Sequence, residues 1–451
     1  MKKYLFLAAA LLMFAVPAAN AQKVNTEKEL AKLEKADASL QDVKKNGKAS
    51  TWNAHGKAYT DAYMLPTKDL LRNIPIHTLM NAGAPIGQEQ GEFAGTPVIV
   101  IKYEYVDVYV DQNMMILGWK QLKSIKEGLA ETAIESYKKA VELDAKLGDK
   151  INTNATTLAT ALSQQGEMLN FNGQIADAAR NFELAYEALC IAPQGEVDAA
   201  TLYNAAMLYT IDASSKSGEE AIAAFAKSEA ICNKVLEVGY KDPTGNIYYY
   251  LFHSYYGQRE KDRDTYLAKA KEALLTGIKL YPKNTTILDG LMSFYTAEEG
   301  VGDPAELTTM IESSLQDDPS NYDLWFGRGR VYNALKNYEE CVKSFEKCVE
   351  LRPNTFEPIF YTGYFIIEKA NALVEALNGR SDLSYEAYDA ENMKINYVFA
   401  EAIPWLEKAH ELNPTDVATI EYLNMLCFRL RDLDGMMDKY NKYHELYLQT
   451  R

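Results

Sequence analysis

The stretch YDLWFGRGRVYNALKNYEECVKSFEKCVELRP, residues 322–353, decides the fold of this 451-residue chain. In its first half, Trp325, Gly329 and Tyr332 follow one another at intervals of four and three residues. Because an α-helix turns once in 3.6 residues, this spacing places all three side chains on one face. The first half is therefore predicted to be a helix with one packing face.

The second half repeats the helical pattern after a short break. Cys341, Phe345 and Cys348 are again spaced by four and three residues. Between the two periodic segments, residues 335–337 supply a turn, and Pro353 ends the second segment because proline cannot continue a helix. The whole stretch is predicted to be an antiparallel helical hairpin.

This hairpin resembles the tetratricopeptide repeat, a unit of about 34 residues with Trp, Leu-Gly, Tyr, Ala, Phe and Pro in a fixed order. It departs from that pattern at Arg328, where Leu is usual, and at Cys341 and Cys348, which replace small Ala residues. Cysteine keeps the position small, so the two helices can still approach closely. The resemblance implies an all-α solenoid, in which each hairpin buries its apolar face against its neighbours.

The unit recurs along the chain. Twelve residues separate Gly329 from Cys341, and twelve also separate Gly166 from Ala178, far upstream. Prolines that can end a second helix recur at unequal intervals, at Pro243, Pro282, Pro319, Pro353 and Pro414. We therefore expect about eight hairpins, several of them degenerate, with a repeat array over residues 148–451 and a mostly helical insertion near residues 370–397.

The first hairpin is predicted to be split. Trp52, Gly56 and Tyr59 have the spacing of a first helix. Ala133, Tyr137 and Ala140, at intervals of four and three residues, have the spacing of a second helix. We assign this hairpin to residues 50–147, with an insertion over about 64–120. A capping helix is predicted before it, over residues 22–49, because a repeat array needs a polar end.

The composition of the insertion is typical of a β-sheet. TPVIVIKYEYVDVYVDQNMMILGW, residues 96–119, is rich in β-branched and aromatic side chains, and Val106, Val108 and Val110 alternate along it. Alternation of this kind predicts strands with one buried face. We expect two or three strands that pack against the helices, since so small a sheet is not stable alone. Helical repeats with a strand insertion resemble secreted tetratricopeptide-repeat proteins of Bacteroidetes.

The N-terminal residues predict export. Lys2 and Lys3 precede an apolar run over residues 4–16, and Ala19-Asn20-Ala21 forms an Ala-x-Ala site. This order is typical of a secretory signal peptide over residues 1–21. No later stretch has the ~18 apolar residues of a membrane span, so no integral membrane anchor is expected. The expected location is the periplasm of a Gram-negative bacterium, or outside the cell.

The charge argues against nucleic-acid partners. The chain has 63 acidic and 47 basic residues and a formal net charge of −16. Such a surface repels a phosphate backbone and lacks the basic stripe that DNA and RNA binding require.

Catalytic and cofactor motifs are missing from the sequence. Its five histidines are scattered, and none forms a pair spaced for a metal site on one helix face. Cys341 and Cys348 are seven residues apart on one helix, roughly 10 Å, which is too far for a disulfide between them. We therefore expect no cofactor, no metal and no enzymatic activity, and buried packing roles for both cysteines.

The resemblance also implies a binding face. In the tetratricopeptide family, one side of each first helix faces a concave groove that binds peptides or partner helices. Mapped by spacing, that side carries aromatic and polar residues, interrupted by Asp289: Tyr203, Asn204, Tyr250, Phe326, Arg330, Phe360 and Tyr364. Only Asn204 and Arg330 could contribute to the family's carboxylate clamp, and they belong to different repeats, so a clamp is not expected.

The function expected from these observations is a non-enzymatic, exported scaffold that binds a protein or peptide in this groove. Two alternatives remain. The 31 tyrosines are compatible with stacking on sugars, which would make the protein a glycan-binding envelope protein. An unrecognised enzymatic site near the strand insertion would use its aromatic residues, Tyr103, Tyr105, Tyr109 and Trp119.

Overall fold

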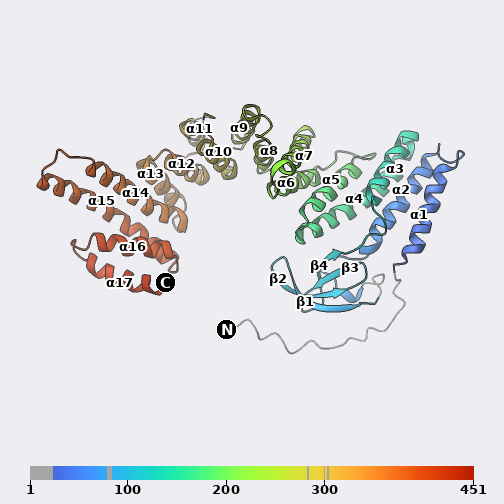
Figure 1. Ribbon diagram of the computed structural model, residues 1–451, viewed down its shortest axis with the longest axis horizontal. Coiled ribbons are helices and arrows are strands. Elements are labelled where there is room, and N and C mark those ends of the chain that lie inside the picture. The colour runs from blue at the N-terminus through green and yellow to red at the C-terminus, as the bar shows by residue number, and fades with distance from the viewer. Residues whose placement is uncertain (1–23, 79–83, 282–283, 299, 302–303, 451) are drawn as a thin grey trace. The chain divides into compact units, whose positions relative to one another are not determined.

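The computed structural model describes residues 24–78, 84–281, 284–298, 300–301 and 304–450 (Figure 1). The predicted signal peptide and Pro282 lie outside these residues. The chain folds as two compact units, one ending at Tyr240 and the other beginning at Lys241.

The first unit consists of a leading helix, three helical hairpins and a sheet. Its helices are α1 (Thr26–Gln41), α2 (Ala49–Met64), α3 (Leu129–Leu143), α4 (Gly148–Phe171), α5 (Ile175–Leu189), α6 (Ala200–Ser214) and α7 (Gly218–Glu237), with short 3-10 turns at Leu65–Thr67, Ile76–Thr78 and Ala145–Leu147. The hairpins pair α2 with α3, α4 with α5, and α6 with α7. The predicted helical-hairpin fold is confirmed.

The second unit contains five more hairpins, each made of two consecutive helices. These are α8 (Asn246–Tyr256), α9 (Arg263–Leu280), α10 (Thr285–Ala297), α11 (Pro304–Asp317), α12 (Tyr322–Ala334), α13 (Tyr338–Leu351), α14 (Phe356–Asn378), α15 (Tyr385–Leu412), α16 (Val417–Arg429) and α17 (Met436–Gln449). The insertion near residues 370–397 is taken up by lengthening both α14 and α15 around a short loop.

A glycine on the first helix faces an aromatic ring on the second helix in several hairpins. A Cβ built on Gly329 would lie 2.6 Å from Cε2 of Phe345, and one built on Gly56 would lie 2.6 Å from Cε1 of Tyr137. Gly166 faces Phe182 in the same way, at 3.2 Å. Only a residue without a side chain lets the two helices approach so closely, which explains why glycine marks this position.

The contact between Gly56 and Tyr137 closes the split hairpin. α2 ends at Met64 and α3 begins at Leu129, yet the two helices pack against each other as directly as consecutive helices do. Thr60 and Tyr137 are hydrogen-bonded through their hydroxyl groups at 2.8 Å, which adds a polar contact to this packing.

The insertion between α2 and α3 is a four-stranded antiparallel meander. Its strands are β1 (Gly87–Phe93), β2 (Thr96–Lys102), β3 (Val106–Val110) and β4 (Ile116–Gln121), in the order β1-β2-β3-β4. The sheet packs on α4, since Trp119 Nε1 donates to Gln165 Oε1 at 3.3 Å and Tyr109 donates to Asn172 Oδ1 at 2.9 Å. Valines of β3 that were predicted to alternate are buried in this contact.

The prediction of two or three strands was too low. The strand that it missed is β1, GQEQGEF, whose residues are polar or glycine and carry no hydrophobic alternation. β1 forms because it pairs along its whole length with β2, through a two-residue turn at Ala94 and Gly95 with positive φ at both positions. Such a turn matches the twist of the two strands and fixes their register.

The leading helix is shorter than the predicted residues 22–49, because α1 ends at Gln41. The carboxylate of Asp42 accepts a hydrogen bond from the backbone N–H of Lys44 at 2.9 Å. This local bond offers the backbone an alternative to the helix and ends it.

Candidate functional site

The seven residues of the predicted binding face are all half-buried, and they divide between the two units. Tyr203 and Asn204 lie on α6 in the first unit, Tyr250 lies on α8, Phe326 and Arg330 lie on α12, and Phe360 and Tyr364 lie on α14. The five members on α8, α12 and α14 share the second unit.

Tyr203 and Tyr250 each lie beside another tyrosine. The ring of Tyr203 packs on Tyr240, near the end of its own unit, with ring centroids 5.4 Å apart. Tyr250 lies beside Tyr249 at 6.5 Å, within a group of rings on α8.

Phe326, Phe360 and Tyr364 do belong to one assembly of rings. Tyr361 lies between Phe326 and Phe360, at 5.9 Å and 5.8 Å from them, and Tyr364 stacks on Phe360 at 6.3 Å. Tyr422 of α16 extends the assembly, 5.7 Å from Tyr364.

At the other end, Tyr322 stacks on Phe326 at 6.0 Å. We call these six residues, Tyr322, Phe326, Phe360, Tyr361, Tyr364 and Tyr422, the aromatic cluster. Every member is half-buried. The rings are therefore held in place by their neighbours while part of each stays accessible.

A small groove adjoins the aromatic cluster, with a volume of about 260 Å³. It is bordered by the first turns of α10, α12 and α14 and is lined by Thr285, Asp289, Tyr322, Asp323, Phe326, Gly327, Arg330 and Glu357. Asp289 and Arg330, on successive first helices, form an ion pair within it. Asp289, which interrupts the predicted binding face, is thus the partner of Arg330, a residue of that face. The guanidinium of Arg330 is already engaged.

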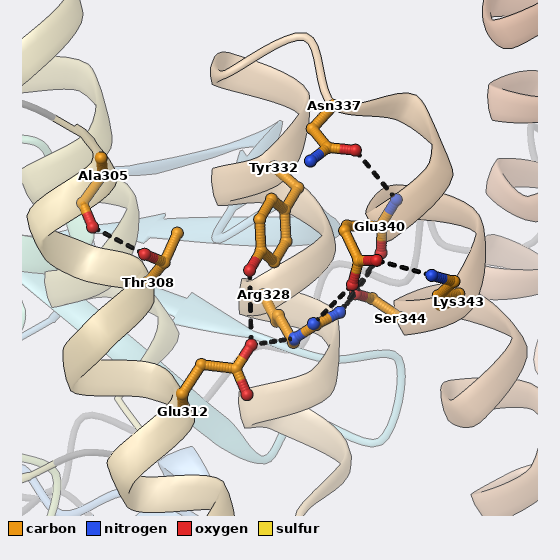
Figure 2. A network of polar contacts seen from close by, with 9 residues as sticks. All are labelled: Ala305, Thr308, Glu312, Arg328, Tyr332, Asn337, Glu340, Lys343 and Ser344. Carbon is orange, nitrogen blue, oxygen red and sulfur yellow. Dashed lines mark hydrogen bonds and ion pairs between the residues drawn. The ribbon is translucent and has the colours of Figure 1, made fainter.

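Arg328 fixes the helix that carries Phe326 and Arg330. Its guanidinium donates to Glu312 of α11 at 2.7 Å, and to Glu340 and Ser344 of α13, each at 2.7 Å (Figure 2). It also lies 4.6 Å from the ring of Tyr332, on its own helix. The side chain that departs from the repeat pattern therefore ties α12 to the helices on both sides.

The alternative enzymatic site near the sheet would use four aromatic side chains. Tyr103, Tyr105, Tyr109 and Trp119 are all buried, and the last two are hydrogen-bonded to residues of α4. Tyr109 and Trp119 therefore pack the sheet onto α4.

Another arrangement in the first unit contains the residue types of a catalytic triad. The imidazole of His55 lies 2.8 Å from Ser136 Oγ and 2.9 Å from Asp37 Oδ1. Ser136 is only 2% exposed, in the interior of α3, and its hydroxyl donates to the carbonyl of Thr132. A substrate cannot reach an oxygen so enclosed, and the three residues instead tie α1, α2 and α3 together.

The cysteines are free thiols, and four of the five are buried. Burial raises the pKa of Cys341 and of Cys348 to about 12, which keeps both as protonated, unreactive packing residues. Over the residues that the structure describes, no group of three His, Cys, Asp or Glu side chains is placed to hold a metal ion. The helices in the same residues include none with the length and apolar character needed to span a membrane.

The hairpin of α12 and α13 matches a family model for the tetratricopeptide repeat over residues 322–355. The chain therefore contains a tetratricopeptide repeat. The assignment rests on this match together with the recurring hairpins and the glycine contacts within them. Among curated proteins, none matches its sequence.

Several solved structures show low similarity to this chain. A TPR-repeat protein from Bacteroides fragilis is 14% identical, with 59% of this chain and 97% of that chain covered and a TM-score of 0.27. Yeast Tom70 is 15% identical, with 71% and 90% covered and a TM-score of 0.24. Human IFIT1, solved as a dimer with m7Gppp-AAAA, is 17% identical, with 71% and 65% covered and a TM-score of 0.31. This chain spans less than two thirds of the IFIT1 chain.

Sequence reasoning missed several residues of the cluster and groove. Tyr322, Asp323 and Glu357 lie in the first turns of their helices, outside the positions that spacing assigned to the binding face. Tyr361 lies one residue after Phe360, and Tyr422 lies one hairpin beyond the last residue of the predicted binding face. The density of aromatic residues in YDLWF and FEPIFYTGYF was the available signal.

Proposed function

We propose that this protein is an exported, non-enzymatic scaffold that binds a protein or peptide partner on the aromatic cluster of α12, α14 and α16. The fold itself is a helical-repeat scaffold, and such folds commonly serve protein interactions. Beyond the scaffold itself, we propose where the partner binds, that the protein is exported and that it is not an enzyme.

One observation carries the proposal. Six aromatic side chains lie in ring contact across three successive first helices, and each keeps part of its surface accessible. Aromatic residues dominate the energetics of protein interfaces, because they bury much area while fixing few torsions. Their neighbours already hold these rings, so binding would cost little further ordering.

The polar neighbours favour some partners over others. Arg330 is paired with Asp289, so it does not offer a free guanidinium to a C-terminal carboxylate. A net charge of −16 also disfavours DNA and RNA as partners. A protein segment that combines apolar side chains with a complementary charge is the partner that these features support.

The test is capture of partners from envelope extract with the full chain and with a variant carrying Phe326→Ala, Phe360→Ala and Tyr364→Ala. Proteins that bind the cluster should be lost from the variant. Its matched control carries Tyr385→Ala and Tyr397→Ala, which remove exposed rings from α15. Both variants should keep the helical circular dichroism of the parent chain.

Capture of the same proteins by the parent chain and the triple variant would contradict the assignment of the cluster. Loss of those proteins from both variants would also contradict it, because the loss would then not depend on the cluster.

A further inference from the structure

We propose that the aromatic cluster selects a basic segment of its partner, one that presents lysine or arginine side chains between apolar residues. This inference rests on the proposed function and names the chemistry of the partner for that same site. The charges at the two ends of the cluster support it.

At the groove end, two carboxylates stand without a basic partner. Asp323 and Glu357 line the groove with Tyr322, and neither forms an ion pair with any described residue. The one arginine of the lining, Arg330, is neutralised by Asp289. A cation that entered the groove would therefore meet two unpaired carboxylates.

The opposite end of the cluster repeats this arrangement. Glu368 lies one helical turn after Tyr364 on α14, on the same face of the helix. Burial, and after it the charge of Glu368, raises the pKa of both Tyr364 and Tyr422. Glu421 contributes to the shift at Tyr422 as well. Within the described residues, neither glutamate takes part in an ion pair.

Helix dipoles weaken the negative charge at one end only. Asp323 and Glu357 lie in the first turns of α12 and α14, where each helix terminus carries about half a positive charge. Glu368 and Glu421 lie further along α14 and α16, beyond the first turn in which that effect acts. Glu368 and Glu421 therefore keep their full charge, whereas the dipoles offset part of the charge of Asp323 and Glu357.

The rings themselves can also receive cations. The guanidinium of Arg352 lies 3.9 Å from the ring of Tyr322, and elsewhere in this unit that of Arg259 lies 4.2 Å from the ring of Tyr256. Cations are attracted to the faces of such rings by their quadrupole. Because Arg352 already lies on the ring of Tyr322, a lysine or arginine of the partner would meet the other rings of the cluster and the carboxylates at its two ends.

The size of the groove points to a side chain rather than to a small molecule. Its volume of about 260 Å³ lies below the roughly 300 to 1,000 Å³ that is usual for small-molecule sites. Gly327 forms part of the lining, and its lack of a side chain lets Leu288 pack closely behind it. A single long side chain, with an apolar stem and a charged end, fits these dimensions and these walls.

The experiment measures fluorescence anisotropy of labelled octapeptides with the full chain. The basic probe is Gly-Leu-Lys-Ala-Lys-Leu-Lys-Gly, and the acidic and neutral probes replace each Lys by Glu or by Gln. Two variants each remove two charges at one end of the cluster: Asp323→Asn with Glu357→Gln, and Glu368→Gln with Glu421→Gln. The control, Glu386→Gln with Asp438→Asn, removes two exposed carboxylates from the first turns of α15 and α17.

We expect the basic peptide to bind more tightly than the other two and to lose affinity as salt is added. Each cluster variant should weaken it by about fivefold to tenfold, whereas the control should change it by less than about twofold. Glu357→Gln alone, at an exposed side chain, should give a smaller loss in the same direction and serves if a double variant folds poorly.

Three results would overturn the inference. These are no detectable binding of the basic peptide, equal affinity for the basic and acidic peptides, or an equal loss in the control and the cluster variants. The proposed function is judged separately by partner capture. A partner that is lost with the aromatic variant but kept with both carboxylate variants would leave the proposed function standing and reject the basic segment.

Discussion

At the scale of single residues, buried charges at the contacts between helices organise this protein. Arg328 joins α11, α12 and α13, and Glu183 does the same for α5, α6 and α7 by accepting from Tyr209 at 2.7 Å and from Lys227 at 2.6 Å. Glu407 accepts from Tyr443 and Lys439 in the last hairpins. In each case one charged group satisfies partners on neighbouring helices, so helix order and spacing depend on it.

Replacing Arg328 by Leu, the residue usual in the repeat family, should destabilise the second unit. Removing one partner of a buried ion pair lowers the free energy of unfolding by about 3 to 5 kcal/mol when the remaining charge stays out of contact with water. Glu312 and Glu340 keep 41% and 24% of their side-chain exposure and can hydrate, so we expect about 2 kcal/mol. Hydrogen exchange of α12 and α13 should report the loss. Arg380→Leu, at an exposed ion pair, is the control and should leave the stability nearly unchanged.

The environment of Glu183 predicts a loss of stability in acid. Burial alone would raise the pKa of this carboxyl, but hydrogen bonds from Lys227 and Tyr209 outweigh burial and hold its pKa below the usual 4.5. A lowered pKa stabilises the fold above pH 4.5, and this contribution disappears as the pH falls through the folded pKa. Urea midpoints measured from pH 7 down to pH 3 should therefore fall less steeply for Glu183→Gln than for the parent chain. An identical pH dependence in the two would count against this role.

The sequence predicts contacts within one hairpin better than contacts between hairpins. The packing positions of Gly329, Phe345 and Cys348 follow from a spacing of three and four residues, because helical geometry alone decides which side chains face the neighbouring helix. The bonds of Arg328 depend on which carboxylates the adjacent hairpins bring close. Spacing within one hairpin carries no information about that contact.

At the scale of elements, the hairpin is the unit that the sequence encodes, and it tolerates interruption. α2 and α3 form a hairpin although the whole β-sheet lies between them in the chain. The hairpin survives because its stability comes from the packed faces and not from the short turn that usually joins two helices. β1 shows the opposite case, since its own residues do not favour a strand and its structure depends on pairing with β2.

Gly56→Ala should test this account of the split hairpin. In an exposed helix this change would stabilise by about 1 kcal/mol, but here the new methyl group would meet the ring of Tyr137 at 2.6 Å. We expect a net loss of about 1 to 3 kcal/mol, as is usual for overpacking, measured by chemical unfolding. Gly47→Ala is the matched control, because nothing lies within 4 Å of a Cβ at that position. Equal stability of the two variants would show that the helices do not depend on this close contact.

At the scale of the whole molecule, the length of the chain reflects the number of repeated hairpins and not a set of independent globular cores. Each hairpin buries its apolar face against its neighbours, so a chain of 451 residues needs no large single core. The surface that results is strongly acidic, whereas the aromatic cluster provides a distinct place for binding. The sequence could predict the architecture because the period repeats. It could not predict the complete cluster, because Tyr361 and Tyr422 join it through contacts between hairpins.

Export makes a specific prediction about the mature chain. When the full sequence is expressed in a Gram-negative host, cleavage after Ala21 should leave Gln22 as the first residue. Mass spectrometry of the N-terminal peptide from the periplasmic fraction checks this. An uncleaved chain that stays with the cytoplasmic fraction would contradict the export proposed above.

The central claim is that the aromatic cluster is where a partner binds. Crosslinking in living cells tests it most directly, with the photoreactive p-benzoyl-phenylalanine placed at position 326 in the cluster or at position 397, an exposed tyrosine of α15. The account predicts a discrete crosslinked protein at position 326 that is absent at position 397 and disappears when Phe360 and Tyr364 are replaced by Ala. No adduct at position 326, or the same adducts at both positions, would contradict it.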